Sequence, residues 1–520
     1  MDAENGLITA HPVGEVQKAV TTALAMDAES VMVIDTLGRR VRVEWDPAAA
    51  VTPMGQLVYF WQFLATAGLF TAWVRHCPLV YTSPNAPDKE DVLGTFLLSA
   101  LAGHHRYAHV TALRCDKVNP VGLGMTQVCS EDSVRLAFKH TDPEACAQWQ
   151  QQALAQTWEP LLKEPWILDL DLTVKPISGR QEGAEISYNP HQPGRPAHAL
   201  HTWFIRKLRL VLDAEVLPGK PHAAKHGRSR LWALWDSWRP EWRPWLMCGD
   251  AGYGQETLMA DCEVRGQNYL FRQRQTRKVQ QLIQQLLGTT TTRWIKTSRG
   301  WEGAEGALRL QGWSRSRRVV VLRRLKTAAA APAPLLAEDP APSLPWTEVV
   351  ASAPEYEHLV LVTNLNNDLV GLTDLYLQRA DAENVYDELK NQWGWGGFMT
   401  KDRHRCQVAV RTVALAYNWW SLFVRCAEPQ RPREAITSRP LWLCGIGRLT
   451  ESGNQLKVQL TSVHAAAAEV QQTLTGLSLF LSGLRNTAEQ LSPRQCWDRI
   501  WDRILAPFLV PTAALPAPSG

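Results

Sequence analysis

Hydrophobic and polar positions change their period several times along the chain, and each period predicts a different kind of element. From 55 to 74 and from 92 to 102, apolar residues recur at helical spacing, which predicts two buried helices. From 166 to 174, polar and apolar residues alternate, which is typical of a strand with two unlike faces. Further runs predict strands at 197–205, 208–216, 245–248, 268–272 and 358–363, and helices at 228–238, 256–264, 372–393 and 402–425. This order of elements predicts an α/β core built on a mixed sheet.

Composition narrows the class of protein. No uninterrupted apolar run of about 18 residues occurs, so we expect no membrane-spanning helix. The N-terminus lacks the basic-then-apolar pattern of a secretion signal. The 10 cysteines contain no C-x-x-C pair, so we expect neither a zinc cage nor a disulfide framework. A reducing, cytoplasmic setting fits this pattern.

Charge is distributed unevenly. The whole chain has a formal net charge of +4, yet residues 264–326 hold 15 lysines and arginines against 2 acidic residues, a local charge of +13. A concentrated basic segment in an otherwise acidic chain indicates a polyanionic partner. A solvated basic face is the alternative interpretation.

Three acidic positions are candidates for chemistry. Asp169 and Asp171 lie two apart in the alternating segment, so both would point to one face of the predicted strand. Asp250 directly follows the strand predicted at 245–248, where functional groups of α/β proteins often stand. Solvent-facing acids on a half-exposed strand, and a turn aspartate, are the corresponding structural interpretations.

The helix predicted at 372–393 carries a polar stripe. At about 100° per residue, Tyr376, Arg379, Glu383 and Lys390 fall within an arc of about 60°. An exposed ion-pair ladder would explain this stripe alone. Beside the aspartates and the basic segment, the stripe instead indicates a metal-binding Glu383 flanked by phosphate contacts. Three carboxylates can hold two Mg²⁺ ions about 4 Å apart, as in phosphodiester chemistry, so we predict a metal-dependent enzyme that acts on a nucleic-acid backbone.

The same four residues match a known signature. The spacing Y-(2)-R-(3)-E-(6)-K is met without a gap by Tyr376, Arg379, Glu383 and Lys390, and the blocks 169–173, 179–184, 188–190 and 249–253 also match. The chain thereby resembles bacterial insertion-sequence transposases of the Asp-Asp-Glu class. The resemblance extends from about 165 to 423.

That resemblance implies roles for individual residues. Asp171 would be the first metal ligand, because it precedes Thr173 in a D-x-T pattern, with Asp169 as the fallback. Asp250 and Glu383 would be the second and third ligands of two Mg²⁺ ions, for which Mn²⁺ is expected to substitute. Tyr376, Arg379 and Lys390 would contact phosphates at the transposon ends.

It also implies a fold and partners. We expect a ribonuclease-H-like mixed-sheet core interrupted by a β-rich insertion domain, with helical N- and C-terminal regions. The expected parts are a helical DNA-binding domain at 1–150, core segments at 160–275 and 358–425, a basic insertion at 276–357, and a helical C-terminal region with a Pro/Ala tail at 426–520. The Ala/Pro-rich stretch 328–345 is expected to be a flexible excursion.

The expected partner is double-stranded DNA, bound by a homodimer associated with the bacterial nucleoid. Many such enzymes take up a flipped base on an aromatic side chain, for which Trp294, Trp301 and Trp313 are candidates.

Two other functions remain open at this point. A DNA-binding protein without catalysis, such as a decayed or domesticated transposase, would keep the basic segment. A metal-dependent glycosyltransferase would use Asp169 and Asp171 as a D-x-D pair for a nucleotide sugar. The basic segment favours the transposase over the glycosyltransferase.

Overall fold

The computed structural model describes residues 32–186, 192–219, 223–326, 355–453, 455–461 and 466–509. The chain divides into two compact units, Met1–Ala50 and Val51–Gly520. In the first unit, the described residues form an antiparallel hairpin of β1 (Met32–Asp35) and β2 (Arg40–Val43). The excursion expected at 328–345 lies outside the described residues.

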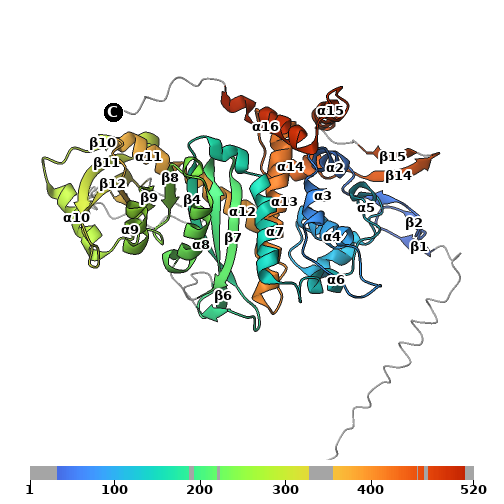
Figure 1. Ribbon diagram of the computed structural model, residues 1–520, viewed down its shortest axis with the longest axis horizontal. Helices are drawn as coiled ribbons and strands as arrows, with labels where there is room; N and C mark the ends of the chain where they lie inside the picture. The colour runs from blue at the N-terminus through green and yellow to red at the C-terminus, as the bar shows by residue number, and fades with distance from the viewer. Residues whose placement is uncertain are drawn as a thin grey trace, which may run out of the picture. The chain divides into compact units, whose positions relative to one another are not determined.

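Five strands form the centre of a ten-stranded sheet. They are β4 (Ile167–Pro176), β6 (Pro196–Ile205), β7 (Leu210–Pro218), β8 (Leu246–Gly249) and β9 (Asn268–Arg272), and they lie in the order β7-β6-β4-β8-β9. β7, β6 and β4 are antiparallel, whereas β4, β8 and β9 are parallel (Figure 1). This is the ribonuclease-H-like mixed sheet expected from the sequence, and the predicted fold class is confirmed.

The segment after β9 extends the same sheet. β13 (Tyr356–Thr363) pairs with β9 and carries β12 (Arg317–Leu325), β11 (Glu302–Leu308) and β10 (Ile295–Lys296) beyond it; β5 (Glu185–Ile186) pairs with β6. The strands β12 and β13 are in register up to Leu325↔Tyr356, and the Lys326 amide then donates to the Glu355 carbonyl at 2.8 Å. The β-rich insertion therefore continues the core sheet, while the finer domain limits stay predictions.

Helices cover both faces of the central strands. They are α8 (Ala223–Ser237), α9 (Glu256–Val264), α10 (Arg277–Gly288), α11 (Leu369–Leu377), α12 (Ala380–Gln392) and α13 (Arg403–Ala427). Gly227 of α8 lies against His201 of β6 so closely that an added Cβ would stand 2.5 Å from the imidazole Nδ1. On the other face, the ring of Tyr386 in α12 meets the ring of Phe204 in β6 at 5.0 Å. These two contacts show that α8 packs on one face of β6 and α12 on the other.

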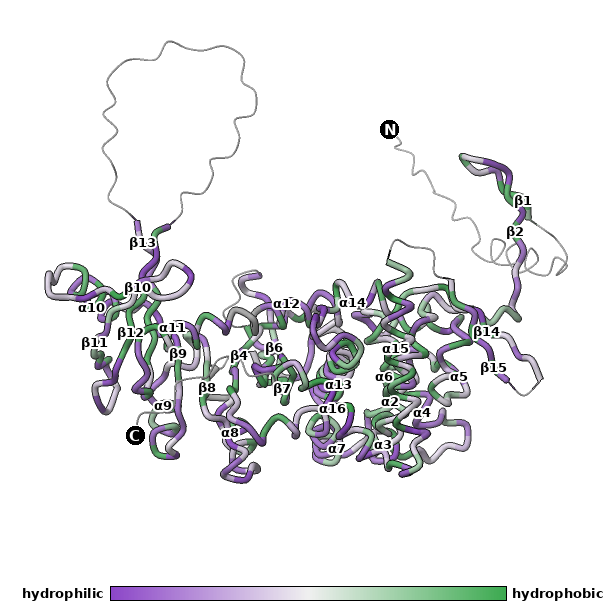
Figure 2. The backbone as a smooth tube through the Cα atoms, turned by 90° about the horizontal axis from the view of Figure 1, so that it is seen from above, coloured by the Kyte–Doolittle hydropathy of each residue, from purple (hydrophilic) through white to green (hydrophobic). Residues whose placement is uncertain are grey.

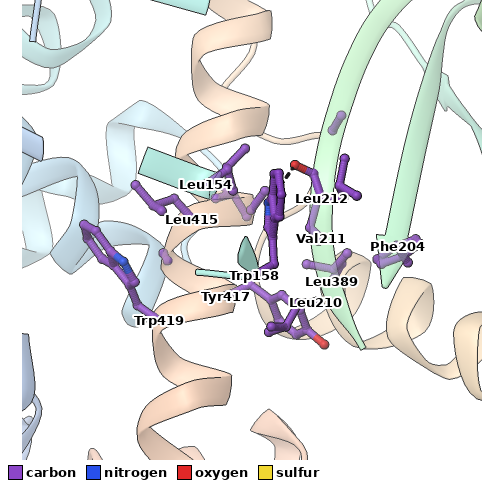
Figure 3. Close-up of a cluster of buried hydrophobic side chains, with 14 of the residues drawn as sticks. Leu154, Trp158, Phe204, Leu210, Val211, Leu212, Leu389, Leu415, Tyr417 and Trp419 are labelled. Carbon is purple, nitrogen blue, oxygen red and sulfur yellow. Dashed lines mark hydrogen bonds between the residues drawn. The ribbon is translucent and has the colours of Figure 1, made fainter. Parts of the chain in front are cut away.

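The 25-residue helix α13 joins the sheet to the helical regions. It contacts β7 on one side and, on others, α2 (Leu57–Thr66), α4 (Lys89–Leu101), α7 (Pro143–Gln156), α15 (Ala467–Arg485) and α16 (Pro493–Leu509). Figure 2 shows hydrophobic stretches along β6, β7 and α13, and Figure 3 shows the side chains that meet there. In that cluster the Trp158 indole donates to the Leu212 carbonyl at 3.2 Å, and Leu389 joins it from α12. The core is thus continuous from the sheet into the helices.

The remaining elements complete both ends of this unit. The helices are α2 (Leu57–Thr66), α3 (Leu69–Arg75), α4 (Lys89–Leu101), α5 (Asn119–Leu123), α6 (Glu131–Leu136), α7 (Pro143–Gln156), α14 (Ala435–Trp442), α15 (Ala467–Arg485) and α16 (Pro493–Leu509). A small sheet contains β3 (Val51–Thr52), β14 (Gly447–Ser452) and β15 (Gln455–Leu460). Short 3₁₀ helices lie at Tyr107–Leu113, Glu159–Lys163, Arg206–Leu208, Pro240–Trp242 and Ser298–Gly300.

Two helices predicted as continuous are each divided. The helix expected at 55–74 is α2 and α3, because Gly68 has a φ of 65°, which favours glycine over other residues. The helix expected at 372–393 is α11 and α12, interrupted at Gln378 and Arg379. Among the described residues, no single helix is long and apolar enough to cross a membrane, and α2 and α3 meet that criterion only as a pair bent by 69°.

Candidate active site

Two aspartates follow the last residues at which the parallel strands β4 and β8 pair. That pair is Leu170↔Gly249; Asp171 is the next residue along β4, and Asp250 is the first residue after β8. Adjacent strands lie about 4.8 Å apart, so the two carboxylates leave the sheet edge as neighbours. Because Asp169 pairs with Cys248 and side chains alternate, Asp171 and Asp250 also share one face of the sheet.

Helix α12 covers that same face. Asp169 of β4 pairs across the strands with Phe204 of β6, whose ring meets Tyr386 of α12. The backbone of Glu383 lies in α12, one turn before Tyr386. The Glu383 side chain lies outside the described residues. The structure thus brings the helix of the third predicted carboxylate onto the face of the first two.

Asp169 is already engaged in a buried ion pair. Arg206 donates from Nε to Oδ2 at 2.8 Å and from Nη2 to Oδ1 at 2.5 Å. The side chains of Asp169 and Arg206 are 1% and 10% exposed. Arg206 also donates from Nη1 to the carbonyl of Leu375 in α11 at 2.5 Å. Asp169 therefore links β4 to α11, and no sequence signal pointed to Arg206 as its partner.

Asp171 makes a looser contact with Arg379. The Nη2–Oδ2 distance is 3.2 Å, and Asp171 Oδ1 accepts from the Leu172 amide at 2.8 Å. Burial lowers the pKa of Arg379, but the negative charge of Asp171 and further acidic neighbours, including Asp250, outweighs burial and raises it overall. Asp250 Oδ1 accepts from the Gly252 amide at 2.8 Å. One buried guanidinium thus compensates the charge of this aspartate pair.

The other two residues of the Y-R-E-K pattern lie in unlike environments. Tyr376 of α11 is buried, which raises its pKa to about 12. Lys390 of α12 is exposed, with its Nζ 5.7 Å from the centre of the Tyr386 ring. The expectation of a single stripe on one helix is wrong, because the helix is interrupted near Arg379 and the first two residues of the pattern turn inward.

Two tyrosines beside the aspartates were not singled out from the sequence. Burial raises the pKa of Tyr253 and of Tyr386 well above the usual value, and Asp171 adds to both shifts. Tyr253 follows Asp250 by three residues in the Gly-rich turn after β8, which was the available signal. Both rings are buried, and electrostatic interactions are stronger in such low-dielectric surroundings than in water.

The donor set has the chemistry of a magnesium site. Asp171 and Asp250 offer carboxylate oxygens, which Mg²⁺ prefers over nitrogen or sulfur ligands. Among the described side chains, no group of three or more His, Cys, Asp or Glu is arranged to hold a metal ion. The two aspartates fit such an ion, with Glu383 as the candidate for the third carboxylate.

The basic segment is partly neutralised by ion pairs. Seven of its cations pair with acids, most of which lie outside the segment, for example Arg317 with Glu256 and Glu263, and Arg324 with Glu357. The other cations of the segment are exposed and make no ion pair within the described ranges: Arg272, Arg274, Arg277, Lys278, Arg293, Lys296, Arg299 and Arg309. The surface charge is therefore smaller than the sequence count of +13.

The three candidate tryptophans each lie under an arginine. Trp301 and Trp313 are both 7% exposed. Trp294 is half-buried, with the Arg323 guanidinium 4.0 Å from its ring centre. A base could stack on Trp301 or Trp313 only after the local packing opened, so a role in base flipping stays a prediction.

Comparison with known proteins gives the family. The family model described as "Transposase DDE domain group 1" matches residues 82–480, which is more than half of the chain. The cryo-EM structure of a piggyBac transposase synaptic complex with hairpin DNA is similar at 10% identity and a TM-score of 0.38, over 88% of this chain and 87% of that one. No curated protein matches the chain. The matched range includes β4, β8 and α12, and the family match shows that the chain belongs to the DDE-domain transposases.

Proposed function

We propose that this transposase binds the inverted-repeat ends of a bacterial insertion sequence, cleaves them and joins them to target DNA, with Asp171, Asp250 and Glu383 as its catalytic carboxylates. The observation that supports this most directly is the adjacency of Asp171 and Asp250 on one sheet face beneath α12. Two Mg²⁺ ions bound there would supply Lewis-acid activation of the attacking oxygen and stabilise the leaving oxygen.

The protein's own groups prepare the site for that chemistry. Arg379 offsets the charge of Asp171 and orients its carboxylate through the 3.2 Å contact. The Gly252 amide orients Asp250, since it donates to one carboxylate oxygen and leaves the other for a ligand. Tyr253 and Tyr386 are buried, and their rings make the surroundings of Asp171 less polar. Such fixed polar groups act strongly in a site that is shielded from solvent.

DNA contacts follow from the same arrangement. Lys390 lies on the surface of α12, and the exposed cations of the basic segment offer further phosphate contacts. Simultaneous binding of two transposon ends favours a homodimer on DNA. The ten cysteines are free thiols, which fits a reducing cytoplasm and work on the nucleoid.

The two alternatives make different predictions. A transposase without catalysis would bind the ends and cleave nothing. A glycosyltransferase would need both Asp169 and Asp171 free for a metal–nucleotide complex, yet Asp169 is held by Arg206. That ion pair and the family argue against the glycosyltransferase.

Cleavage of DNA that carries the element's inverted repeats tests the proposal. We expect cleavage in Mg²⁺ or Mn²⁺ that Glu383→Gln, Asp171→Asn or Asp250→Asn abolishes. Asp387→Asn is the matched control, because Asp387 is an exposed acid on the same helix that contacts Asn391. Full cleavage by Glu383→Gln would refute the assigned site. End binding without cleavage in any divalent ion would leave the non-catalytic alternative.

A further inference from the structure

A cavity of about 220 Å³ opens between α12, α13 and the segment before α14. The proposed reaction does not use it. Its lining is mainly polar, with Arg209, Arg425, Arg433, Glu388 and Glu434, and Tyr417, Trp420 and Val424 contribute the apolar part. Several polar groups that converge on one cavity can fix the orientation of a small-molecule ligand.

The three arginines of this cavity are not equivalent. Arg209 pairs with Glu434 at 2.9 Å, and Arg433 pairs with Glu428 at 2.8 Å. Within the described part of the chain Arg425 makes no ion pair, and its Nε is buried without a hydrogen-bond partner. Its Nη2 donates to the Leu208 carbonyl at 3.4 Å. The guanidinium therefore retains capacity for a bidentate anion.

The surroundings make a buried Arg425 guanidinium energetically unfavourable unless an anion binds to it. Burial lowers the pKa of Arg425; Tyr417 and Glu388 oppose this effect, and the positive charge of Arg209 adds to it. Burial also raises the pKa of Glu388, whose carboxyl accepts from the Ala435 amide at 3.0 Å. A buried charge without an ion-pair partner is strongly destabilising. An anionic ligand on Arg425 would offset that cost.

The wall formed by α13 indicates what the anion carries. Tyr417, Trp420 and Val424 line the cavity from the same face of α13 as Arg425, and the Tyr417 hydroxyl is fixed by donating to the Arg209 carbonyl at 2.9 Å. An inorganic anion would leave this apolar wall unused. We propose that the cavity binds an organic phosphate monoester, with the phosphate on Arg425 and the organic group against Tyr417 and Trp420.

Such a phosphate has two sources, a free nucleotide or the 5′-phosphate end of a DNA strand. Isothermal titration of the full chain with dTMP, and with one oligonucleotide bearing either a 5′-phosphate or a 5′-hydroxyl, separates them. If free nucleotide is the ligand, dTMP binds. If a strand end is the ligand, dTMP does not bind and the 5′-phosphate strengthens oligonucleotide binding.

In either case Arg425→Met should weaken the phosphate-dependent binding by about tenfold or more, since a charge-assisted bidentate contact is lost. Arg431→Met is the matched control, because Arg431 is exposed nearby and does not line the cavity. Ser421→Leu, which narrows the cavity without changing its charge, should weaken binding as well. Unchanged binding in folded Arg425→Met and Ser421→Leu, or no phosphate-dependent binding to the wild type, would overturn the proposal. DNA cleavage is not the readout, so loss of the proposed function would leave this test intact.

Discussion

Replacement of Arg206 by methionine tests how strongly the buried ion pair beside the active site links β4 to α11. The guanidinium makes two hydrogen bonds to Asp169, at 2.8 and 2.5 Å, and one to the Leu375 carbonyl at 2.5 Å. With 1% and 10% of the two side chains exposed, solvent cannot replace these contacts. Removal of one partner from a buried pair typically costs about 3–5 kcal/mol. Because three hydrogen bonds are lost, we expect Arg206→Met to cost about 4 kcal/mol of unfolding free energy.

Urea unfolding followed by tryptophan fluorescence measures this cost in the wild type, Arg206→Met, Asp169→Asn and the double variant. The double variant should lose less than the sum of the single variants, by about 1–3 kcal/mol, since no charge remains unpaired. Lys207→Met is the matched control, because the neighbouring pair Lys207–Glu164 is exposed (32% and 60%) and should contribute below about 1 kcal/mol. Additive effects, or an Arg206→Met cost no larger than that of Lys207→Met, would refute the reasoning.

Three further outcomes are expected. Burial lowers the pKa of Lys175 from 10.5 to about 8, so the unfolded chain binds more protons between these values. Burial of the charged Lys175 therefore lowers the free energy of unfolding by about 3 kcal/mol below pH 8, and this loss disappears as the pH rises to 10.5. Lys175→Met should raise the melting temperature at pH 7 and not at pH 10.5; a melting temperature below that of the wild type at pH 7 would contradict this. Gly396 has a φ of 77°, and an added Cβ would stand 3.2 Å from the Lys175 side chain, so Gly396→Ala should cost about 1–2 kcal/mol in urea unfolding, whereas Gly476→Ala, in an open helical position, should cost nothing. Lys390→Ala should weaken binding to DNA ends and reduce the salt slope by about 0.9, with the exposed Lys457→Ala as control; an unchanged slope would exclude a phosphate contact.

The sheet was the most predictable part of the fold. Period-two alternation located β4, and short apolar runs bounded by turns located β8 and β9. Such strands can be located because the pattern of apolar residues within a strand indicates which of its faces are buried. The division between α11 and α12 was missed, since Gln378 and Arg379 keep helical dihedral angles and contain no glycine or proline. Their interruption depends on what each helix packs against, which local sequence does not contain.

The candidate site was predictable only in part for the same reason. Sequence spacing cannot tell Asp169 from Asp171, because both point to one face of β4; the partner that separates them, Arg206, comes from the end of another strand. The basic segment was overestimated because Glu256, Glu263 and Glu357, which neutralise part of it, lie outside it in sequence. Pairing between distant residues is a property of the folded sheet.

The register of β12 and β13 has a consequence for engineering. The pairing of the two strands ends at Leu325↔Tyr356, and Lys326 and Glu355 extend it by one backbone hydrogen bond and an ion pair. Lys326 and Glu355, the described residues on either side of 327–354, are therefore hydrogen-bonded neighbours. Since the entropy of closing a loop grows only as the logarithm of its length, a doubling or halving changes stability by about 0.6 kcal/mol. Residues 327–354 are therefore the place where a fluorescent or affinity module can be spliced into this transposase while the ten-stranded sheet keeps its pairing.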